Sequence, residues 1–205
     1  MAKYNLRGLP RLDYICSRDE LRLPLNYVMI DRGWLVATNG HILMVISGSD
    51  AGLNEDELRI AHGKALHWEQ WAAMLTKHDV VEFTEECVLA VSGSETTKFP
   101  YTKPMGMEGG KFIDWRAVMA PDQLPVTAVD NIAFNPELAY KIFQVVKPMK
   151  IHPVSPKFTF SGGNKAIFFN YEEYDVYGLL MPTYRLLDHP AEIAGIYKRL
   201  KKRVK

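Results

Sequence analysis

The run from Trp34 to Ile46 consists of two apolar segments separated by turn residues. Residues 34–37 and 42–46 are rich in Val, Ile, Leu and aromatic residues, and Thr38-Asn39-Gly40-His41 lies between them. Asn-Gly favours a tight reversal because both residues tolerate positive φ. The pattern predicts a β-hairpin at 34–46 that follows a strand at 25–31. Such a turn is common in purely structural hairpins.

Two later segments have helical periodicity. In 63–78, Trp68, Trp71, Ala72 and Leu75 recur at helical spacing. A second helix is expected over 136–147, because Asn135 is a good N-cap and Pro136 suits the first helical position. Its predicted buried residues are Leu138, Ile142, Val145 and Val146.

Short β-prone runs surround each predicted helix. They lie at 58–61, 80–83, 87–91 and 96–101 around the first helix, and at 132–134, 157–160, 166–170 and 176–180 around the second. The chain therefore repeats a unit of one strand, one helix and three strands, about 60–70 residues long, with an eroded copy at 1–46. The predicted class is α+β.

Prolines at 121 and 125 mark the best domain boundary. We predict a domain of two units at 1–121, a half-domain at 122–186 and a basic helix or tail at 187–205. In that tail Ile193, Ile196, Tyr197, Leu200 and Val204 recur at helical spacing. A purely solubilising tail is the alternative.

Composition excludes several functional classes. Lys and Arg number 25 against 24 Asp and Glu, a formal charge of +1, so overall charge favours no particular partner. Cys16 and Cys87 lack zinc-like spacing, and we expect reduced thiols in a cytoplasmic protein without an export signal or membrane span. We expect no metal and no cofactor.

No convincing catalytic constellation is present, so we expect a protein that is not an enzyme. His62, His67, Glu85-Glu86 and Asp114 are better interpreted as surface or backbone-bonding residues. Ser161-Gly162-Gly163-Asn164 joins two strands and lacks the Lys-Ser/Thr and helix of a phosphate loop. An unrelated α+β enzyme stays the least favoured alternative.

Three ordered segments resemble one family. Residues 37–43, ATNGHIL, resemble the ATDGHRLA signature of bacterial DNA sliding clamps, the β subunits of DNA polymerase III. Residues 110–119, GKFIDWRAVM, resemble its G-K/R-F-P-D-Y-R-x-V-L segment. FNPEL at 134–138, FSGGNKAI at 160–167 and YGLLMP at 177–182 resemble its last half-domain. Three matches in the same order make coincidence a poor explanation.

The resemblance implies a fold and two functions. Clamps place their helices on one face of curved antiparallel sheets, so the helices at 63–78 and 136–147 should lie on the same side. Those helices line a hole in which Lys and Arg contact the phosphates of duplex DNA without reading bases. A surface groove takes short motifs of polymerases, clamp loaders and other replication proteins.

Both sets of site residues follow position by position from the resemblance. The implied groove comprises Leu25, Thr38, Gly40, His41, Leu43, Ile113, Val118, Asn135, Leu138, Asn164, Ala166, Leu179, Met181 and Pro182. The expected DNA-binding residues are Lys64, Lys77, Lys141 and Lys147 on the helices and Lys198, Arg199, Lys201, Lys202, Arg203 and Lys205 in the tail.

This chain also departs from the family pattern. Asn39 replaces Asp, Ile42 a basic residue, Ile113 a Pro and Leu138 a frequent Tyr, so motif preference can differ. If a ring needs about twelve units, three per chain give about four subunits and a homo-oligomeric ring. The reduced size suggests a phage or another mobile element. The main alternative is a clamp mimic that inhibits or redirects a polymerase or clamp loader without encircling DNA.

Overall fold

The computed structural model describes residues 4–102, 112–119, 132–151, 155–162 and 165–183. The N-terminal part begins with β1 (Tyr4–Asn5) and three 3-10 segments, η1 (Leu6–Gly8), η2 (Leu12–Tyr14) and η3 (Glu20–Asn26). Strands β2 (Tyr27–Asp31), β3 (Trp34–Thr38) and β4 (Ile42–Ser47) follow. The hairpin predicted at 34–46 is therefore confirmed.

The middle part contains α1 (Glu55–Ile60), β5 (Lys64–His67), α2 (Trp68–Lys77), β6 (Val80–Phe83), β7 (Cys87–Ser92) and β8 (Glu95–Pro100). The remaining elements are α3 (Trp115–Met119), α4 (Pro136–Val146), η6 (Lys147–Met149), β9 (Lys157–Thr159), β10 (Ile167–Tyr171) and β11 (Val176–Leu180).

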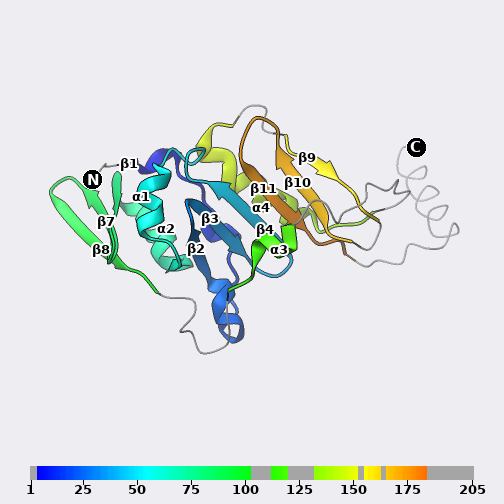
Figure 1. Cartoon of the computed structure of the whole chain (residues 1–205), viewed down its shortest axis with the longest axis horizontal. Helices are drawn as coiled ribbons and strands as arrows, with labels where there is room; N and C mark the ends of the chain where they lie inside the picture. The colour runs from blue at the N-terminus through cyan, green and yellow to red at the C-terminus, as the bar shows by residue number, and fades with distance from the viewer. Residues whose placement is uncertain (1–3, 103–111, 120–131, 152–154, 163–164, 184–205) are drawn as a thin grey trace, which may run out of the picture.

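The strands form two antiparallel sheets. The larger sheet has seven strands in the order β5-β2-β3-β4-β11-β10-β9, and the smaller has four in the order β1-β6-β7-β8. Figure 1 shows β7 and β8 at one end of an elongated molecule and β9 to β11 at the other. Strand β11 pairs with β4, so strands from both predicted domains share one sheet. The boundary at 121–125 lies outside the described residues.

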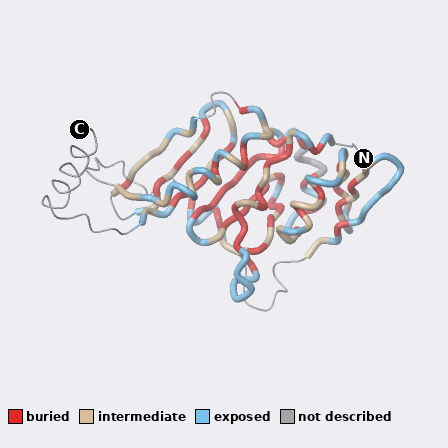
Figure 2. Tube along the Cα trace, turned by 180° about the vertical axis from the view of Figure 1, so that it is seen from behind, coloured by how far each residue is buried: buried red, intermediate tan, exposed pale blue. Residues whose placement is uncertain are grey.

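Alternation along the strands separates the two faces of the seven-stranded sheet. On β4, Ile42, Met44 and Ile46 belong to the main core, whereas Leu43 and Val45 belong to a smaller cluster. Because successive side chains of a strand point to opposite faces, the two clusters lie on opposite sides of the sheet. Buried segments run through the middle of the chain trace in Figure 2.

Helices α2 and α4 lie on the same side, as predicted. Trp71 and Met74 of α2 and Ile142 and Val145 of α4 are fully buried in the same main core. The indole Nε1 of Trp71 donates a hydrogen bond of 2.9 Å to the Pro10 carbonyl, which fixes α2 to the chain before η2. The fold is therefore α+β, with its two long helices on one face.

Two predicted strands and the start of one predicted helix are wrong. Residues 58–61 are not a strand, because α1 occupies 55–60. Residues 132–134 are not a strand either. The helix predicted at 63–78 begins only at Trp68, because His67 and Gln70 form a capping box and 64–67 pair with β2.

The predicted repeat is visible in this order of elements. The second unit is β5-α2-β6-β7-β8, and the described residues of the third contain α4-β9-β10-β11. In the first unit, β1-η-β2-β3-β4, the 3-10 segments take the place of an α-helix. The first two units exchange strands, since β1 pairs with β6 and β5 pairs with β2.

Candidate functional site

The β3–β4 turn is held by its own side chains. Asn39 Oδ1 accepts hydrogen bonds from the N–H groups of His41, at 2.9 Å, and Ile42, at 3.0 Å. The Thr38 hydroxyl donates to the Ile42 carbonyl at 2.8 Å and accepts from the Gly40 N–H at 3.1 Å. Gly40 has φ +86°, a conformation that side chains disfavour. Asn at position 39 thus supplies the acceptor oxygen that an Asp would supply.

The end of β11 lies between this turn and the segment that leads into α4. The Met181 N–H donates to the His41 carbonyl at 2.8 Å, and the Thr183 N–H donates to the Ala133 carbonyl at 2.8 Å. Leu179 pairs directly with Leu43 in the β4–β11 ladder. Segments far apart in sequence therefore converge on Met181.

Apolar side chains form a buried floor beside the junction at Met181, where the end of β11 meets the β3–β4 turn. Leu43 and Leu179 are buried in the smaller cluster with Trp115 and Met119 of α3, and Ala166 packs against it. Val118 and Met181 remain 45% and 41% exposed. The arrangement is an apolar floor with exposed hydrophobic side chains beside it, which suits the anchors of an extended peptide.

Helix α3 is pinned to the sheet by Asp31 of β2. The Trp115 indole N–H donates to Asp31 Oδ2 at 2.8 Å, the Arg116 guanidinium donates to the same oxygen, and His62 Nδ1 lies 3.3 Å from Oδ1. Burial raises the pKa of Asp31, but the hydrogen bonds from Arg116 and Trp115 and the nearby charges outweigh it and hold the pKa below its ordinary value.

A row of rings extends from α3 across this face. The ring centres of Trp115 and Trp34 are 5.8 Å apart, those of Trp34 and Tyr177 6.2 Å, and those of Tyr177 and Phe168 6.4 Å. The four aromatic residues of this row come from α3, β3, β11 and β10. Among the described residues, one short helix and aromatic side chains thus cover the face opposite the long helices.

The structure brings most of the predicted groove residues together, but not all. Leu25 lies near the turn, because a Cβ added to Gly40 would stand 3.8 Å from Leu25 Cδ1. Ile113 and Pro182 are half-buried. Leu138 packs against the main core and not against the smaller cluster that contains Leu43 and Leu179. Asn164 lies outside the described residues.

Two predicted groove residues stabilise local backbone structure. The Thr38 side chain is buried and serves the turn. Asn135 caps α4, since its Oδ1 accepts from the Glu137 N–H at 2.9 Å. Both residues therefore fix local backbone, Thr38 in the β3–β4 turn and Asn135 at the start of α4.

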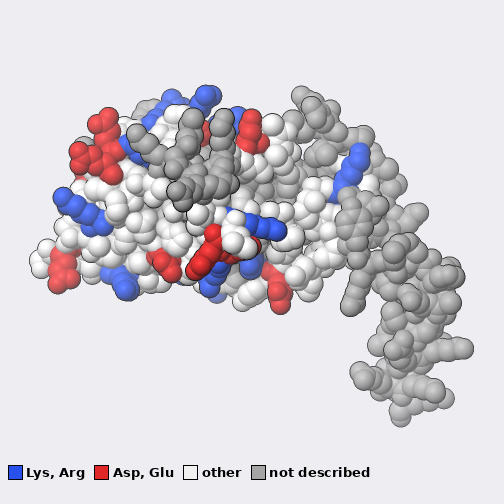
Figure 3. All heavy atoms as spheres, turned by 90° about the horizontal axis from the view of Figure 1, so that it is seen from below, with Lys and Arg blue, Asp and Glu red and all other residues white. Residues whose placement is uncertain are grey.

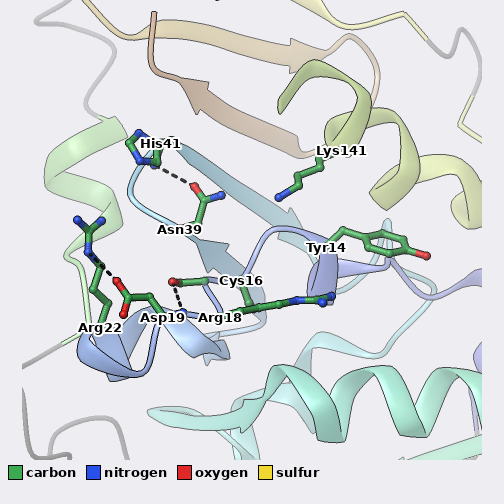
Figure 4. Close-up of a pocket in the computed structure, with 9 residues that line it drawn as sticks. Tyr14, Cys16, Arg18, Asp19, Arg22, Asn39, His41 and Lys141 are labelled. Atoms are coloured by element: carbon green, nitrogen blue, oxygen red, sulfur yellow. Dashed lines mark hydrogen bonds and ion pairs between the residues drawn. The ribbon is translucent and has the colours of Figure 1, made fainter. Parts of the chain in front are cut away.

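A hollow of about 680 Å³ lies next to the turn, on the side of the long helices (Figure 4). Its lining is mainly cationic or polar: Tyr14, Cys16, Ser17, Arg18, Asp19, Arg22, Asn39, His41 and Lys141. Arg22 Nε lies 3.6 Å from Asp19, and the Arg18 guanidinium lies 4.3 Å from the Trp68 ring centre. Sequence analysis missed Arg18 and Arg22 because they lie in a stretch without periodicity.

The Cys16 thiol in this hollow is not an activated nucleophile. Burial raises the pKa of the Cys16 thiol, which therefore stays protonated at neutral pH. Among the described residues, no group of three or more His, Cys, Asp or Glu side chains could hold a metal ion. No described helix is long and apolar enough to cross a membrane.

The predicted DNA-binding cations separate into four groups. Lys77 and Lys147 are exposed at the C-terminal ends of α2 and α4, and Lys141 lines the hollow. Lys64 was predicted on the polar face of a helix, and this is wrong: it lies on β5, its ammonium group bonds the Glu85 carbonyl and sits 5.2 Å from the Tyr101 ring centre. The six tail cations lie outside the described residues.

Charges of both signs alternate over the visible surface. In Figure 3, acidic and basic side chains are interspersed along the face seen from below. On α2 and α4 the acidic residues Glu69 and Glu137 accompany the lysines. The described part of the two helices is thus only weakly cationic.

No family model matches the chain, and no curated protein matches it. Solved structures do match. The DNA polymerase sliding clamp from Pseudomonas aeruginosa aligns with a TM-score of 0.55 and 16% identity over 90% of this chain and 66% of that one. The sliding clamp from Bacillus subtilis aligns with a TM-score of 0.58 and 11% identity over 89% of this chain and 64% of that one.

A sliding clamp from Bartonella birtlesii, solved with bound griselimycin, gives a TM-score of 0.54 and 15% identity over 90% of this chain and 66% of its own. The chain spans just under two thirds of the length of the clamp chains that it matches. Its fold is that of the DNA sliding clamps, which confirms the fold expected from the sequence resemblance.

Proposed function

We propose that this chain is a non-enzymatic, clamp-like replication factor. It binds duplex DNA without sequence preference on the side of α2 and α4, and it docks short motifs of polymerase, clamp loader or other replication proteins beside Met181. The observation that carries the proposal is the junction at Met181, where His41 of the β3–β4 turn meets the end of β11 within a clamp fold.

The chemistry of the junction supports motif docking. Leu43 and Leu179 give an apolar floor, and Val118 and Met181 are exposed hydrophobic side chains beside it. An extended peptide with Leu or Phe anchors matches such a surface. Asn39 and Ile42 differ from the family signature, so we expect a motif preference of its own.

Positive charge on the helix side supports sequence-independent DNA binding. Arg18, Lys77, Lys141 and Lys147 lie there, and the tail adds six cations by sequence. Phosphate contacts of this kind carry no base information and weaken as salt rises.

Retention on closed DNA tests the central claim. The protein is loaded by a clamp loader with ATP onto a nicked circular duplex, half of the sample is linearised, and both halves are passed through a sizing column in moderate salt. A closed clamp stays on the circle and slides off the line. Equal loss from both molecules would show that the protein does not encircle DNA.

A clamp mimic is the second candidate, and one observation favours it. The outward face of α4 presents Tyr140 and Phe143, 62% and 38% exposed, where a helix against DNA would carry cations. Such a protein would occupy the clamp site of a polymerase or clamp loader and inhibit or redirect that partner. Its solution mass discriminates: a ring predicts an oligomer of about four chains, whereas a stable monomer excludes autonomous clamping.

A further inference from the structure

Helix α4 carries large apolar side chains on both of its faces. Ile142, Val145 and Val146 are buried in the main core. On the outer face, Tyr140 and Phe143 are exposed and their ring centres lie 6.5 Å apart. Phe134, 39% exposed, precedes the helix. We call Phe134, Tyr140 and Phe143 the α4 aromatic stripe.

The described chain ends beside this stripe. The Thr183 N–H donates to the Ala133 carbonyl at 2.8 Å, next to Phe134 in sequence. Residues 184–205 therefore leave the described structure at the N-terminal end of α4. A segment joined to the chain at this point meets the stripe at a high effective concentration, of millimolar order.

The sequence of 190–204 complements the stripe. Its apolar residues Ile193, Ile196, Tyr197, Leu200 and Val204 fall within an arc of about 100° at roughly 100° per residue. None of the six cations between 198 and 205 falls in that arc. As a helix the segment would be about 22 Å long, enough to cover the eleven residues of α4, about 16 Å.

We propose that residues 190–204 form an amphipathic helix that docks its apolar side on the α4 aromatic stripe. Docking removes both apolar surfaces from water and leaves the cations on the outside of the pair. Because α4 lies on the helix side of the sheet, the six cations then face the same way as Lys141 and Lys147. The consequence for DNA rests on the proposed function; the docking itself does not.

Hydrogen exchange of the full chain tests the docking. We expect the backbone amides of 190–204 to be protected in the natural sequence. A Tyr140→Ser/Phe143→Ser variant should lose at least about tenfold of that protection, since the fold does not depend on these exposed rings. Ile60→Ser is the matched control: Ile60 is 41% exposed but lies on α1, and the tail should keep its protection.

Three outcomes would overturn the proposal. The first is an unprotected tail in the natural protein, and the second is a tail that stays protected in the double variant. The third is protection that rises with protein concentration, because it would mean that a second copy covers the stripe.

A thiol cross-link gives an independent readout. A Tyr140→Cys/Tyr197→Cys chain treated with a short bismaleimide should yield an intramolecular cross-link, assigned by peptide mass. An Ile60→Cys/Tyr197→Cys chain should yield at least about tenfold less. Equal yields would contradict docking on α4.

Deletion of 190–205 separates this inference from the proposed function. If the tail docks and DNA is bound as proposed, the deletion lowers DNA affinity and flattens its salt dependence. Exchange protection together with unchanged DNA binding would leave the docking standing and remove the DNA role of the tail.

Discussion

The two faces of the seven-stranded sheet are covered to very different depths. On the helix face, α2 and α4 bury Trp71, Met74, Ile142 and Val145 completely. On the other face the described residues contribute the five residues of α3 and a row of rings, of which Trp34 and Tyr177 are half-buried. Within the described part of the chain, one face thus has a continuous core, and the other has a thin layer that is held at the polar anchor formed by Asp31.

This difference separates folding from binding. Stability comes mainly from the deep core, because apolar burial is the largest favourable term in folding. The junction at Met181 lies at the edge of the thin layer, where side chains can respond to a ligand without loss of the core. We therefore expect substitutions towards the core to change the free energy of unfolding, and substitutions at the groove edge to change affinity alone.

A large effect on stability should come from Gly178, at the centre of β11. A Cβ there would collide with the Phe169 ring, which belongs to the main core, and with the Leu43 carbonyl oxygen. Gly178→Ala should lower the free energy of unfolding by about 2–3 kcal/mol, measured by urea denaturation, because neither neighbour can move away freely. Gly8→Ala is the control, since nothing lies within 4 Å of its added Cβ. A loss below about 1 kcal/mol would mean that the core adapts easily.

Loss of the polar anchor at Asp31 should lower the free energy of unfolding by a smaller amount. Asp31→Asn weakens the hydrogen bonds from Trp115 and Arg116, and we expect a loss of about 1–2 kcal/mol at neutral pH, reduced by the partial exposure of Arg116. Urea denaturation across pH measures it. Glu86→Gln, which alters an exposed carboxylate, should cost far less.

The pH dependence of that difference follows from the lowered pKa of Asp31. A carboxyl whose folded pKa is depressed contributes stability above its unfolded pKa, about 3.9. The contribution is lost as pH falls through the folded pKa. The gap between the natural protein and Asp31→Asn should therefore be constant near neutrality and close in acid. A gap that widens on acidification would refute the assignment of Asp31 as a charged anchor.

Local signals explain what the sequence predicted well. The β3–β4 hairpin follows from Asn39 and Gly40, whose side chain and φ make the turn by themselves. Helix α4 follows from Asn135, whose side chain caps it, and from Pro136. Each signal acts over a few residues, so no knowledge of the tertiary structure is needed.

Tertiary contacts explain what the sequence did not reveal. Lys64 reads as part of a helix, but 64–67 pair with β2, and this pairing overrides local periodicity. The anchor of α3 joins Asp31 to residues 84 and 85 positions away. Arg18 and Arg22 form a hollow with Lys141 only because η2 packs between the helices and the sheet.

Met181 tests the groove without disturbing either core. Met181→Ala should weaken binding of a peptide with Leu and Phe anchors by about 1 kcal/mol, roughly fivefold in Kd, as measured by calorimetry. Leu43→Ala is a poorer probe, because Leu43 is buried and its loss would cost about 2–5 kcal/mol of stability. Ile60→Ala is the matched control, equally exposed at 41% but on α1. If the natural protein, Met181→Ala and Ile60→Ala bind the peptide with equal affinity, the partner site lies elsewhere.

The smallest expected effect distinguishes two lysines that the sequence treated alike. Lys141→Ala removes a cation from the hollow beside the long helices, whereas Lys64→Ala removes one from β5, where its ammonium group already bonds the Glu85 carbonyl. Both variants change the net charge equally, so a general charge effect cancels in the comparison. If Lys141 contacts one phosphate, its loss should reduce the slope of log affinity against log salt by about 0.9 for duplex DNA. Lys64→Ala should leave that slope unchanged. Fluorescence anisotropy over a range of salt measures both, and equal slopes for the two variants would show that Lys141 does not contact a phosphate.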